Sequence, residues 1–224
     1  MMLHAGLGGI VLCGGHSSRM NYPKAWLPFG AERMLQRVVR ILGELTEPVV
    51  VVAAVGQPLP WLSSNVIVVR DTLDSLGPLH GLAVGLRTLA NLPNGRCPRA
   101  LVAPCDAPLV QLQLLAHLAA QGESSEIVVP RFEGRFQPLT AIYSVELWSR
   151  AEALLSADRR RVVELIEMSH TRVIEAAELA PFDPRFESFQ NVNTPEQYFA
   201  SVAAAGLKTP PWITSRLQLR PTVD

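Results

Sequence analysis

The chain has 224 residues, of which 48% are hydrophobic and 18% charged, as in a soluble globular protein with one sizeable core. Lys and Arg together number 20, as do Asp and Glu, so zero net charge gives no electrostatic reason to expect nucleic acid as a partner. No apolar run is long enough to span a bilayer, no basic segment of a secretory signal opens the chain, and the three cysteines form no CxxC pair. We therefore expect a cytoplasmic protein with no membrane partner.

The first half of the chain alternates between strand and helix patterns. Apolar runs predict strands, and apolar residues at helical spacing predict helices. This alternation favours an α/β fold, a Rossmann-like three-layer sandwich with a mostly parallel sheet and helices on both faces, whose ligand binds at the carboxyl ends of the strands. The expected strands are 10–13, 49–55, 66–69 and 100–103, and the expected helices are 34–45, about 80–91 and one after residue 112.

The pattern changes after about residue 123. We expect one domain over 1–205, with halves at 1–122 and 123–205, and a tail over 206–224 that frays because it holds three prolines. In the second half the expected strands are 127–130, 136–143 and 172–174, and the expected helices are 145–156, 161–168 and 195–205.

The loop over residues 12–24, L-C-G-G-H-S-S-R-M-N-Y-P-K, carries the clearest chemical signal. Its glycines let backbone N–H groups form a nest for an anion, its serines add hydroxyl donors, and its two basic residues add positive charge. Such a loop suits a triphosphate, whereas the absence of GxxxxGK[ST] and GxGxxG disfavours P-loop ATPases and dehydrogenases. Alternatively, the glycines form only a turn and the basic side chains are solvated. The residues concerned are Gly14, Gly15, Ser17, Ser18, Arg19 and Lys24.

Two aspartates follow predicted strands. Asp106 ends the run V-A-P-C-D, and because Mg²⁺ usually takes one or two protein carboxylates plus phosphate oxygens and water, Asp106 alone would suffice as its protein ligand. Asp71 precedes S-L-G-P-L-H-G, in which Gly77 would let the backbone pass close to a ligand. The structural alternatives are a helix N-cap for Asp106 and an exposed turn for Asp71, and Asp74 competes with Asp71 for any nucleotide contact.

The pattern L-x-G-G-x-S-x-R-M-x-x-x-K resembles the signature loop of nucleotidyltransferases. The blocks F-Q-P-L-T-A-I-Y at 136–143 and N-V-N-T-P-E at 191–196 are similar to those of the molybdenum cofactor guanylyltransferases, the branch that makes molybdopterin-guanine dinucleotide. The sequence departs from this branch at Asn21, where Gly is usual but Asn tolerates positive φ. It also departs at Ala53 and Ala54, near which an Asn is often found, so guanine specificity is less firmly indicated than the reaction type.

The resemblance implies a nucleotide-diphospho-sugar transferase-like fold, with a nucleotide-binding half at 1–122 and an acceptor-binding half at 123–205. It also implies transfer of GMP from GTP to the terminal phosphate of molybdopterin, with release of pyrophosphate and with Mg²⁺ as the metal. Proteins that deliver molybdopterin or mature molybdoenzymes become candidate partners. The alternatives are a cytidylyl- or sugar-phosphate nucleotidyltransferase, and a non-catalytic nucleotide-binding adaptor in cofactor assembly.

The candidate residues take their roles partly from their own chemistry and partly from the resemblance. The three basic residues of the run Arg159–Arg161 are candidates for an acceptor phosphate or for a solvated helix start, and Asn191 and Asn193 are also explained as residues that precede a capped helix. The catalytic candidates are Arg19, Lys24 and Asp106, with Asp106 as the metal ligand. The nucleotide-binding candidates are Leu12, Cys13, Gly14, Gly15, Ser17, Ser18, Lys24, Asp71, Gly77 and Asp106, and the acceptor-binding candidates are Gln137, Pro138, Asn191 and Asn193.

Overall fold

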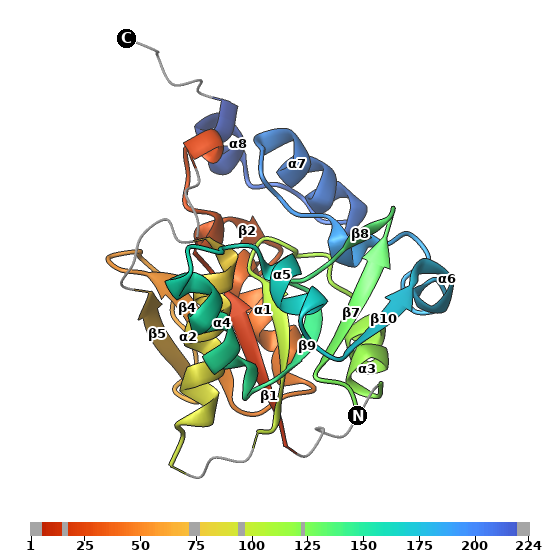
Figure 1. Ribbon diagram of the computed structural model, residues 1–224. Coiled ribbons are helices and arrows are strands. Elements are labelled where there is room, and N and C mark those ends of the chain that lie inside the picture. The colour runs from red at the N-terminus through yellow and green to blue at the C-terminus, as the bar shows by residue number, and fades with distance from the viewer. Residues whose placement is uncertain (1–5, 15–17, 72–76, 94–96, 122–123, 219–224) are drawn as a thin grey trace.

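A twisted central sheet organises the computed structural model, which describes residues 6–14, 18–71, 77–93, 97–121 and 124–218, without the side chains of Ser18 and Gln218. Within these residues the sheet has eight strands in the order β10-β7-β9-β6-β1-β4-β5, and β8 pairs with β7 (Figure 1). Neighbouring strands are parallel except at β9, which runs antiparallel to β6 and β7, and at the short β7–β8 pair. The strands are β1 (Leu7–Leu12), β4 (Val49–Ala54), β5 (Val66–Asp71), β6 (Arg99–Pro104), β7 (Ile127–Phe132), β8 (Arg135–Phe136), β9 (Ala141–Ser144) and β10 (Thr171–Glu175).

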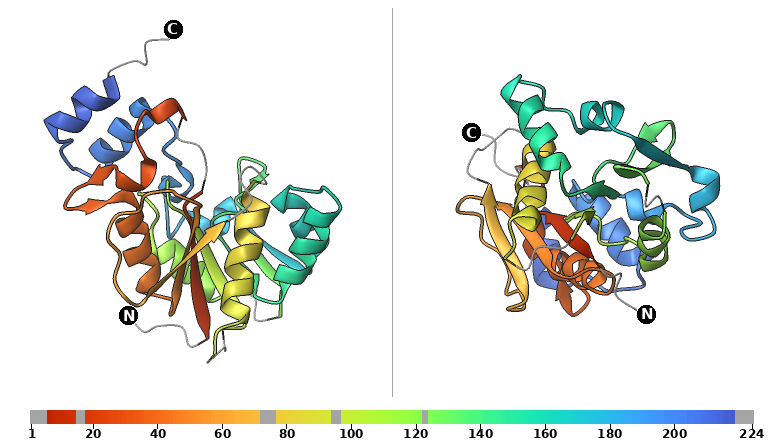
Figure 2. Two further views of the ribbon diagram at one scale, coloured as in Figure 1. Left: turned by 90° about the vertical axis from the view of Figure 1, so that its left-hand side faces the viewer. Right: turned by 60° about the horizontal axis from the view of Figure 1, so that its bottom comes forward.

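Helices cover both faces of the sheet, as Figure 2 shows from the side. Each face carries its own buried apolar cluster, because side chains of a buried parallel strand point alternately to the two layers of helices. Among the described residues, no helix is both long and apolar enough to cross a membrane. One face is covered by α1 (Met34–Gly43), α3 (Leu112–Ala119) and α6 (Ala176–Leu179), and the other by α2 (Pro78–Ala90), α4 (Leu147–Ser156) and α5 (Val162–Glu167).

A third apolar cluster lies beyond the carboxyl ends of the central strands, at the top of Figure 1. It joins segments from both ends of the chain, and the Tyr198 hydroxyl ties them together by donating to the carbonyl oxygen of Pro28 over 2.7 Å. Its members in helices and strands come from η1 (Ser18–Met20), β2 (Pro28–Phe29), the start of α1, and the helices α7 (Pro195–Ala204) and α8 (Pro211–Gln218). The turn η2 (Lys24–Trp26) precedes β2 in the chain, and β2 pairs with β3 (Glu32–Arg33) in a hairpin.

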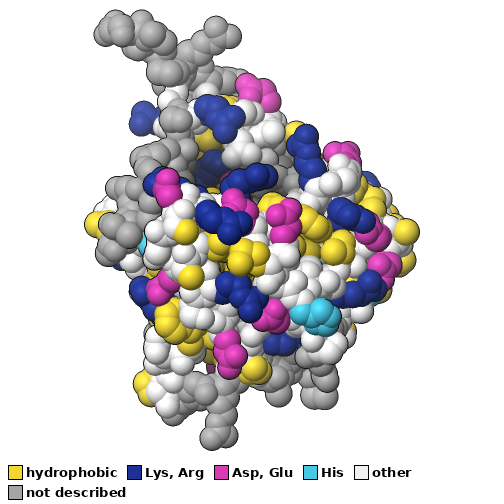
Figure 3. Space-filling view, in the orientation of Figure 1, with side chains coloured by type: hydrophobic (Ala, Val, Ile, Leu, Met, Phe, Trp, Pro, Cys, Tyr) yellow, Lys and Arg dark blue, Asp and Glu magenta, His cyan; other side chains and the backbone are white. Residues whose placement is uncertain are grey.

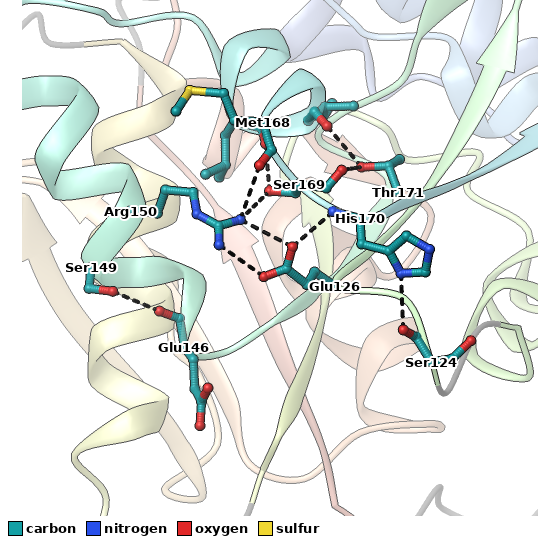
Figure 4. Close-up of polar contacts among 11 residues, drawn as sticks. Ser124, Glu126, Glu146, Ser149, Arg150, Met168, Ser169, His170 and Thr171 are labelled. Atoms are coloured by element: carbon teal, nitrogen blue, oxygen red, sulfur yellow. Dashed lines mark hydrogen bonds and ion pairs between the residues drawn. The ribbon is translucent and has the colours of Figure 1, made fainter.

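The opposite edge of the sheet is tied by ion pairs and hydrogen bonds. Arg150 on α4 reaches Glu126 at 3.1 Å and Ser169 at 2.9 Å, and the Glu126 carboxylate also accepts the backbone N–H of His170 (Figure 4). Glu126 and His170 directly precede β7 and β10, so this cluster fixes α4 against the amino ends of two strands. The hydrogen bond from Arg150, followed by that from His170, lowers the pKa of Glu126 below its ordinary value of 4.5.

The architecture confirms the predicted fold class, with two local corrections. The strand expected over 136–143 is wrong as one element: a turn separates β8 from β9, because Pro138 has no N–H to donate to a ladder. The expectation that 206–224 fray is wrong for Pro211–Gln218, which form α8. Ile213 and Leu217 lie one turn apart and are buried in the third cluster, so packing stabilises this helix.

Candidate nucleotide-binding site

Three side chains from distant parts of the chain meet at the carboxyl edge of the sheet. The Lys24 ammonium donates to Asp106 Oδ2 over 2.9 Å and to Asn193 Oδ1 over 2.6 Å. Lys24 and Asp106 are only 16% and 19% exposed, so the charges are partly removed from water while one side stays open. The cluster therefore joins two predicted catalytic residues to one predicted acceptor-side residue.

The backbone around Asp106 explains how this meeting arises. Asp106 follows β6, and its carbonyl oxygen accepts the N–H of Val192 over 2.8 Å, which holds the segment 191–194 against the end of the strand. The N-cap alternative for Asp106 is wrong, since α3 begins at Leu112 and its N-cap is Gln111. The Asp106 carboxylate therefore does not cap a helix, and it can take part in binding a ligand.

The start of the loop continues the hydrogen bonding of the sheet. Cys13 donates its N–H to the carbonyl of Val52, and Cys105 donates to that of Leu12, so these segments stay in register past the strand ends. Both cysteines are buried, and the Cys13 thiol together with burial raises the pKa of Cys105, in keeping with a packing role. Gly14 is exposed, and a Cβ added there would meet no atom of the described residues within 4 Å, so on the side of the described residues there is room for a ligand directly after the strand.

The rest of the loop is described in part. Gly15, Ser17 and the side chain of Ser18 lie outside the described residues. Arg19 lies on η1 with its side chain exposed, and Asn21 adopts a φ of 48°, the left-handed conformation expected for an Asn in a position usually held by Gly.

Gln57 is a site residue that sequence analysis missed. Its side-chain amide donates to the carbonyl of Cys13 over 2.8 Å and accepts the N–H of Ala54 over 3.1 Å, so it joins the ends of β1 and β4 where the loop begins. The sequence does contain a feature that could have indicated this role, because Gln57 follows a glycine at the end of a predicted strand. Gly56 has a φ of 73°, and the tight turn that it forms brings the polar Gln57 side chain back to the edge of the sheet.

Asp71 is the last residue of β5, and its carboxylate lies 2.7 Å from His80 Nδ1 in the first turn of α2. The exposed-turn alternative is therefore wrong, since Asp71 belongs to β5 and its side chain is only 21% exposed, close to His80 on another element. Gly77 is the N-cap of α2 with φ of 80°, a conformation that favours glycine. Asp74 lies outside the described residues.

The acceptor-side candidates divide into two groups. Gln137 and Pro138 lie in the turn between β8 and β9, where the Tyr143 hydroxyl donates to the Pro138 carbonyl over 2.7 Å. Asn191 is exposed and precedes α7. Within the described parts of the chain, Asn193 is the member of this set that hydrogen-bonds to Lys24.

The basic run at 159–161 is largely engaged with carboxylates. Arg159 pairs with Glu164, and Arg160 lies 2.8 Å from Asp158, both as exposed ion pairs. Basic and acidic side chains are likewise interspersed over the face seen in Figure 3. These contacts favour the interpretation of the run as a solvated helix start.

Comparison with known proteins identifies the family. The family described as "MobA-like NTP transferase domain" matches residues 9–173. The chain belongs to this family. A "Probable molybdenum cofactor guanylyltransferase" of Mycobacterium marinum is 39% identical over 192 residues, covering 84% of this chain and 89% of that protein, and one of Mycobacterium tuberculosis is 36% identical over 208 residues, covering 91% and 92%.

Solved structures agree on the fold of this MobA-like nucleotidyltransferase. The "Molybdopterin-guanine dinucleotide biosynthesis protein A" of Archaeoglobus fulgidus superposes with a TM-score of 0.72 at 19% identity, over 89% of this chain and 98% of that one. The 2-C-methyl-D-erythritol 4-phosphate cytidylyltransferase of Thermus thermophilus gives a TM-score of 0.63 at 17% identity, over 89% and 99%. The predicted enzyme class, nucleotidyltransferase, is thereby confirmed through the family.

The site of this MobA-like enzyme fits a magnesium ion that is shared with a substrate. Among the described residues, no group of three or more His, Cys, Asp or Glu side chains could form an all-protein cage. Mg²⁺ bound to nucleotides takes one or two carboxylates and fills its octahedron with phosphate oxygens and water. Asp106 supplies such a carboxylate beside the cationic Lys24, at the open edge of the sheet.

Proposed function

We propose that this enzyme transfers GMP from GTP to the terminal phosphate of molybdopterin and releases pyrophosphate. The convergence of Lys24, Asp106 and Asn193 carries the proposal, because it joins the triphosphate loop, a metal carboxylate and the acceptor half at one point. The names of relatives at 36–39% identity supply the substrates.

In the proposed reaction an oxygen of the acceptor phosphate attacks the α-phosphorus of GTP. A new phosphorus–oxygen bond forms as the bond between that phosphorus and the oxygen bridging the α- and β-phosphates breaks, and pyrophosphate leaves with the bridging oxygen. No covalent enzyme intermediate is needed, so catalysis consists of positioning and charge stabilisation. Arg19, Lys24 and the backbone N–H of Gly14 are proposed to hold the triphosphate, while Leu12 and Cys13 place the loop, since the Cys13 N–H is bonded to the Val52 carbonyl.

Lys24 changes partner in this scheme. In the structure its ammonium pairs with Asp106, and with nucleotide present it would turn to the phosphate oxygens, which would leave Asp106 free to hold Mg²⁺. The metal would offset the negative charge that develops on the phosphates. An ion pair that can be exchanged in this way keeps both groups in place before substrate arrives.

The remaining candidates are assigned by their place along the edge of the sheet. Asp71 and Gly77 at the end of β5 are proposed to contact the nucleoside, where a carboxylate can accept two donors from a guanine edge. Gln137, Pro138, Asn191 and Asn193 are proposed to face the acceptor. We further propose a cytoplasmic enzyme that receives molybdopterin from a delivering protein or passes its product to molybdoenzyme maturation.

The test is a nucleotide panel. Calorimetry with each of the four NTPs, with and without Mg²⁺, is expected to show selective Mg²⁺-dependent GTP binding, and added molybdopterin is expected to release pyrophosphate. Preference for CTP or UTP would replace the guanylyl substrate with that of a cytidylyl- or sugar-phosphate enzyme. Nucleotide binding without pyrophosphate release would favour an adaptor.

A further inference from the structure

Helix α8 packs against the signature loop from outside the sheet. The Trp212 ring lies 6.1 Å from that of Tyr22, centroid to centroid, with 61° between the planes, an edge-to-face pair. Met20 is fully buried in the same apolar cluster as Ile213 and Leu217, which are 0% and 5% exposed. Figures 1 and 2 both show the red-orange segment of the loop beside the blue C-terminal helices.

Met20 and Tyr22 lie within the stretch that bears the catalytic cations. Arg19 directly precedes Met20, and Lys24 follows Tyr22 by two residues. Asn21, between the two braced residues, adopts the left-handed conformation that Asn tolerates, so the chain turns sharply between the two contacts with the third cluster. The Arg33 guanidinium lies 6.0 Å from the centroid of the Trp212 ring, so Trp212 is also fixed from the β2–β3 hairpin.

We propose that α8 is a positioning element for the triphosphate loop: Trp212, Ile213 and Leu217 hold Met20 and Tyr22, and thereby place Arg19 and Lys24. This inference rests on the proposed binding of a nucleoside triphosphate by the loop. The family match ends at residue 173, so α8 lies outside the segment that defines the family. A displacement of about 1 Å in positioned groups can cost about a hundredfold in rate, so a packing helix can control catalysis without contacting substrate.

The decisive variants are Trp212→Ala, Trp212→Phe and Tyr22→Leu. The alanine variant removes the aromatic contact, the phenylalanine variant keeps an aromatic ring, and the leucine variant breaks the same contact from the side of the loop. Trp61→Ala is the matched control, because that indole is 78% exposed and packs against nothing in the third cluster. All proteins are compared at a temperature where circular dichroism shows them folded.

We expect Trp212→Ala and Tyr22→Leu to raise KM for GTP and Kd for inorganic tripolyphosphate about tenfold, since loosely held groups lose part of their effective concentration. The KM for the acceptor stays unchanged, Trp212→Phe restores most of the affinity, and Trp61→Ala behaves as wild type. A purely structural role would lower the active fraction, and so kcat, at constant KM.

Unchanged KM and tripolyphosphate affinity in both disruptive variants would overturn the role of α8 while leaving the proposed function intact. If wild type prefers another NTP, that nucleotide replaces GTP in the same comparison, because the loop contacts phosphates and not the base. Failure of wild type to bind any NTP or tripolyphosphate would refute the proposed function and the role of α8 with it.

Discussion

Replacing Lys24 by Met tests the core of the site. The substitution keeps the length of the side chain but removes the ammonium that bonds to Asp106 at 2.9 Å and to Asn193 at 2.6 Å. The lost hydrogen bond to a charged group is worth about 1.5–3 kcal/mol, and an exposed ion pair only about 0–1 kcal/mol. The Lys24 and Asp106 side chains are both less than one-fifth exposed, so the range for charged hydrogen bonds applies rather than that for exposed ion pairs. We therefore expect the free energy of unfolding to fall by about 2 kcal/mol, in the lower half of that range.

The effect of Lys24→Met on catalysis should be larger than its effect on folding. A loss of about 2 kcal/mol corresponds to a fall of about 4–8 °C in Tm for a chain of this size, which leaves the protein folded at 25 °C. Removal of one donor that stabilises developing negative charge typically lowers the rate about 10²–10³-fold. We expect kcat/KM for GTP, measured by pyrophosphate release, to fall by this factor.

Lys208→Met is the matched control for this experiment. Lys208 is the other lysine of the chain and is exposed after α7, so its substitution should change neither Tm nor kcat/KM. A Lys24→Met enzyme whose kcat/KM stays within twofold of wild type would refute the assignment of Lys24 to the triphosphate. A second substitution, Asp106→Asn, should cost less stability in the Lys24→Met background than alone, because the two residues share one interaction.

Three further substitutions probe single features. Gly14→Ala should leave Tm unchanged but weaken GTP binding in calorimetry, because the new methyl group meets no atom of the described residues and occupies the space before the loop; unaltered affinity contradicts this. His80→Phe should raise KM for GTP and relax discrimination against ATP, because Asp71 loses the polar imidazole that lies 2.7 Å from its carboxylate, whereas selectivity equal to wild type would rule out a role for the pair. Glu126→Gln should lower stability at pH 7 but not at low pH. Because the pKa of Glu126 is lowered in the folded state, ionised Glu126 stabilises the fold at pH values above 4.5, and this stabilisation is lost as the pH falls through the folded-state pKa. If the free energies of unfolding of wild type and Glu126→Gln differ by the same amount at pH 7 and at pH 3, the link to Arg150 is disproved.

The parts of the site that could be predicted follow from local sequence and one rule of topology. Parallel strands place the residues after them at one edge, so Gly14 and Asp106 could be assigned to the same edge without knowing the order of the strands. The loop chemistry and the left-handed Asn21 follow from residue types alone. These predictions needed no knowledge of contacts between distant segments.

The features that could not be predicted depend on packing between segments that are distant in the sequence. Lys24 and Asn193 are 169 residues apart, and no local sequence pattern predicts that the segment before α7 lies over the end of β6. Helix α8 has weak local signals, since its prolines suggest irregular structure and its stability comes from burying Ile213 and Leu217. Gln57 was missed because its role is to join two strand ends, which is visible only once β1 and β4 are known to be neighbours.

The structure separates two explanations of the N-V-N-T-P-E segment that the sequence left open. Thr194 caps α7, accepting the N–H of Gln197 at 3.3 Å while the Gln197 side chain returns to the Thr194 N–H, so the Asn193 side chain is not needed for capping and instead accepts from Lys24. Thr194→Ala should therefore lower the free energy of unfolding by about 1 kcal/mol with little change in KM. Asn193→Ala leaves Lys24 paired with Asp106, so it should lower Tm by no more than about 4 °C, as for a loss of up to about 1 kcal/mol, but raise KM for the acceptor and lower kcat. The opposite pattern, with Asn193→Ala unstable and fully active, would return the segment to a purely structural role. Because Lys24 also contacts Asp106, an effect of Asn193 on both substrates would mean that the acceptor half helps to place the cation that holds the triphosphate.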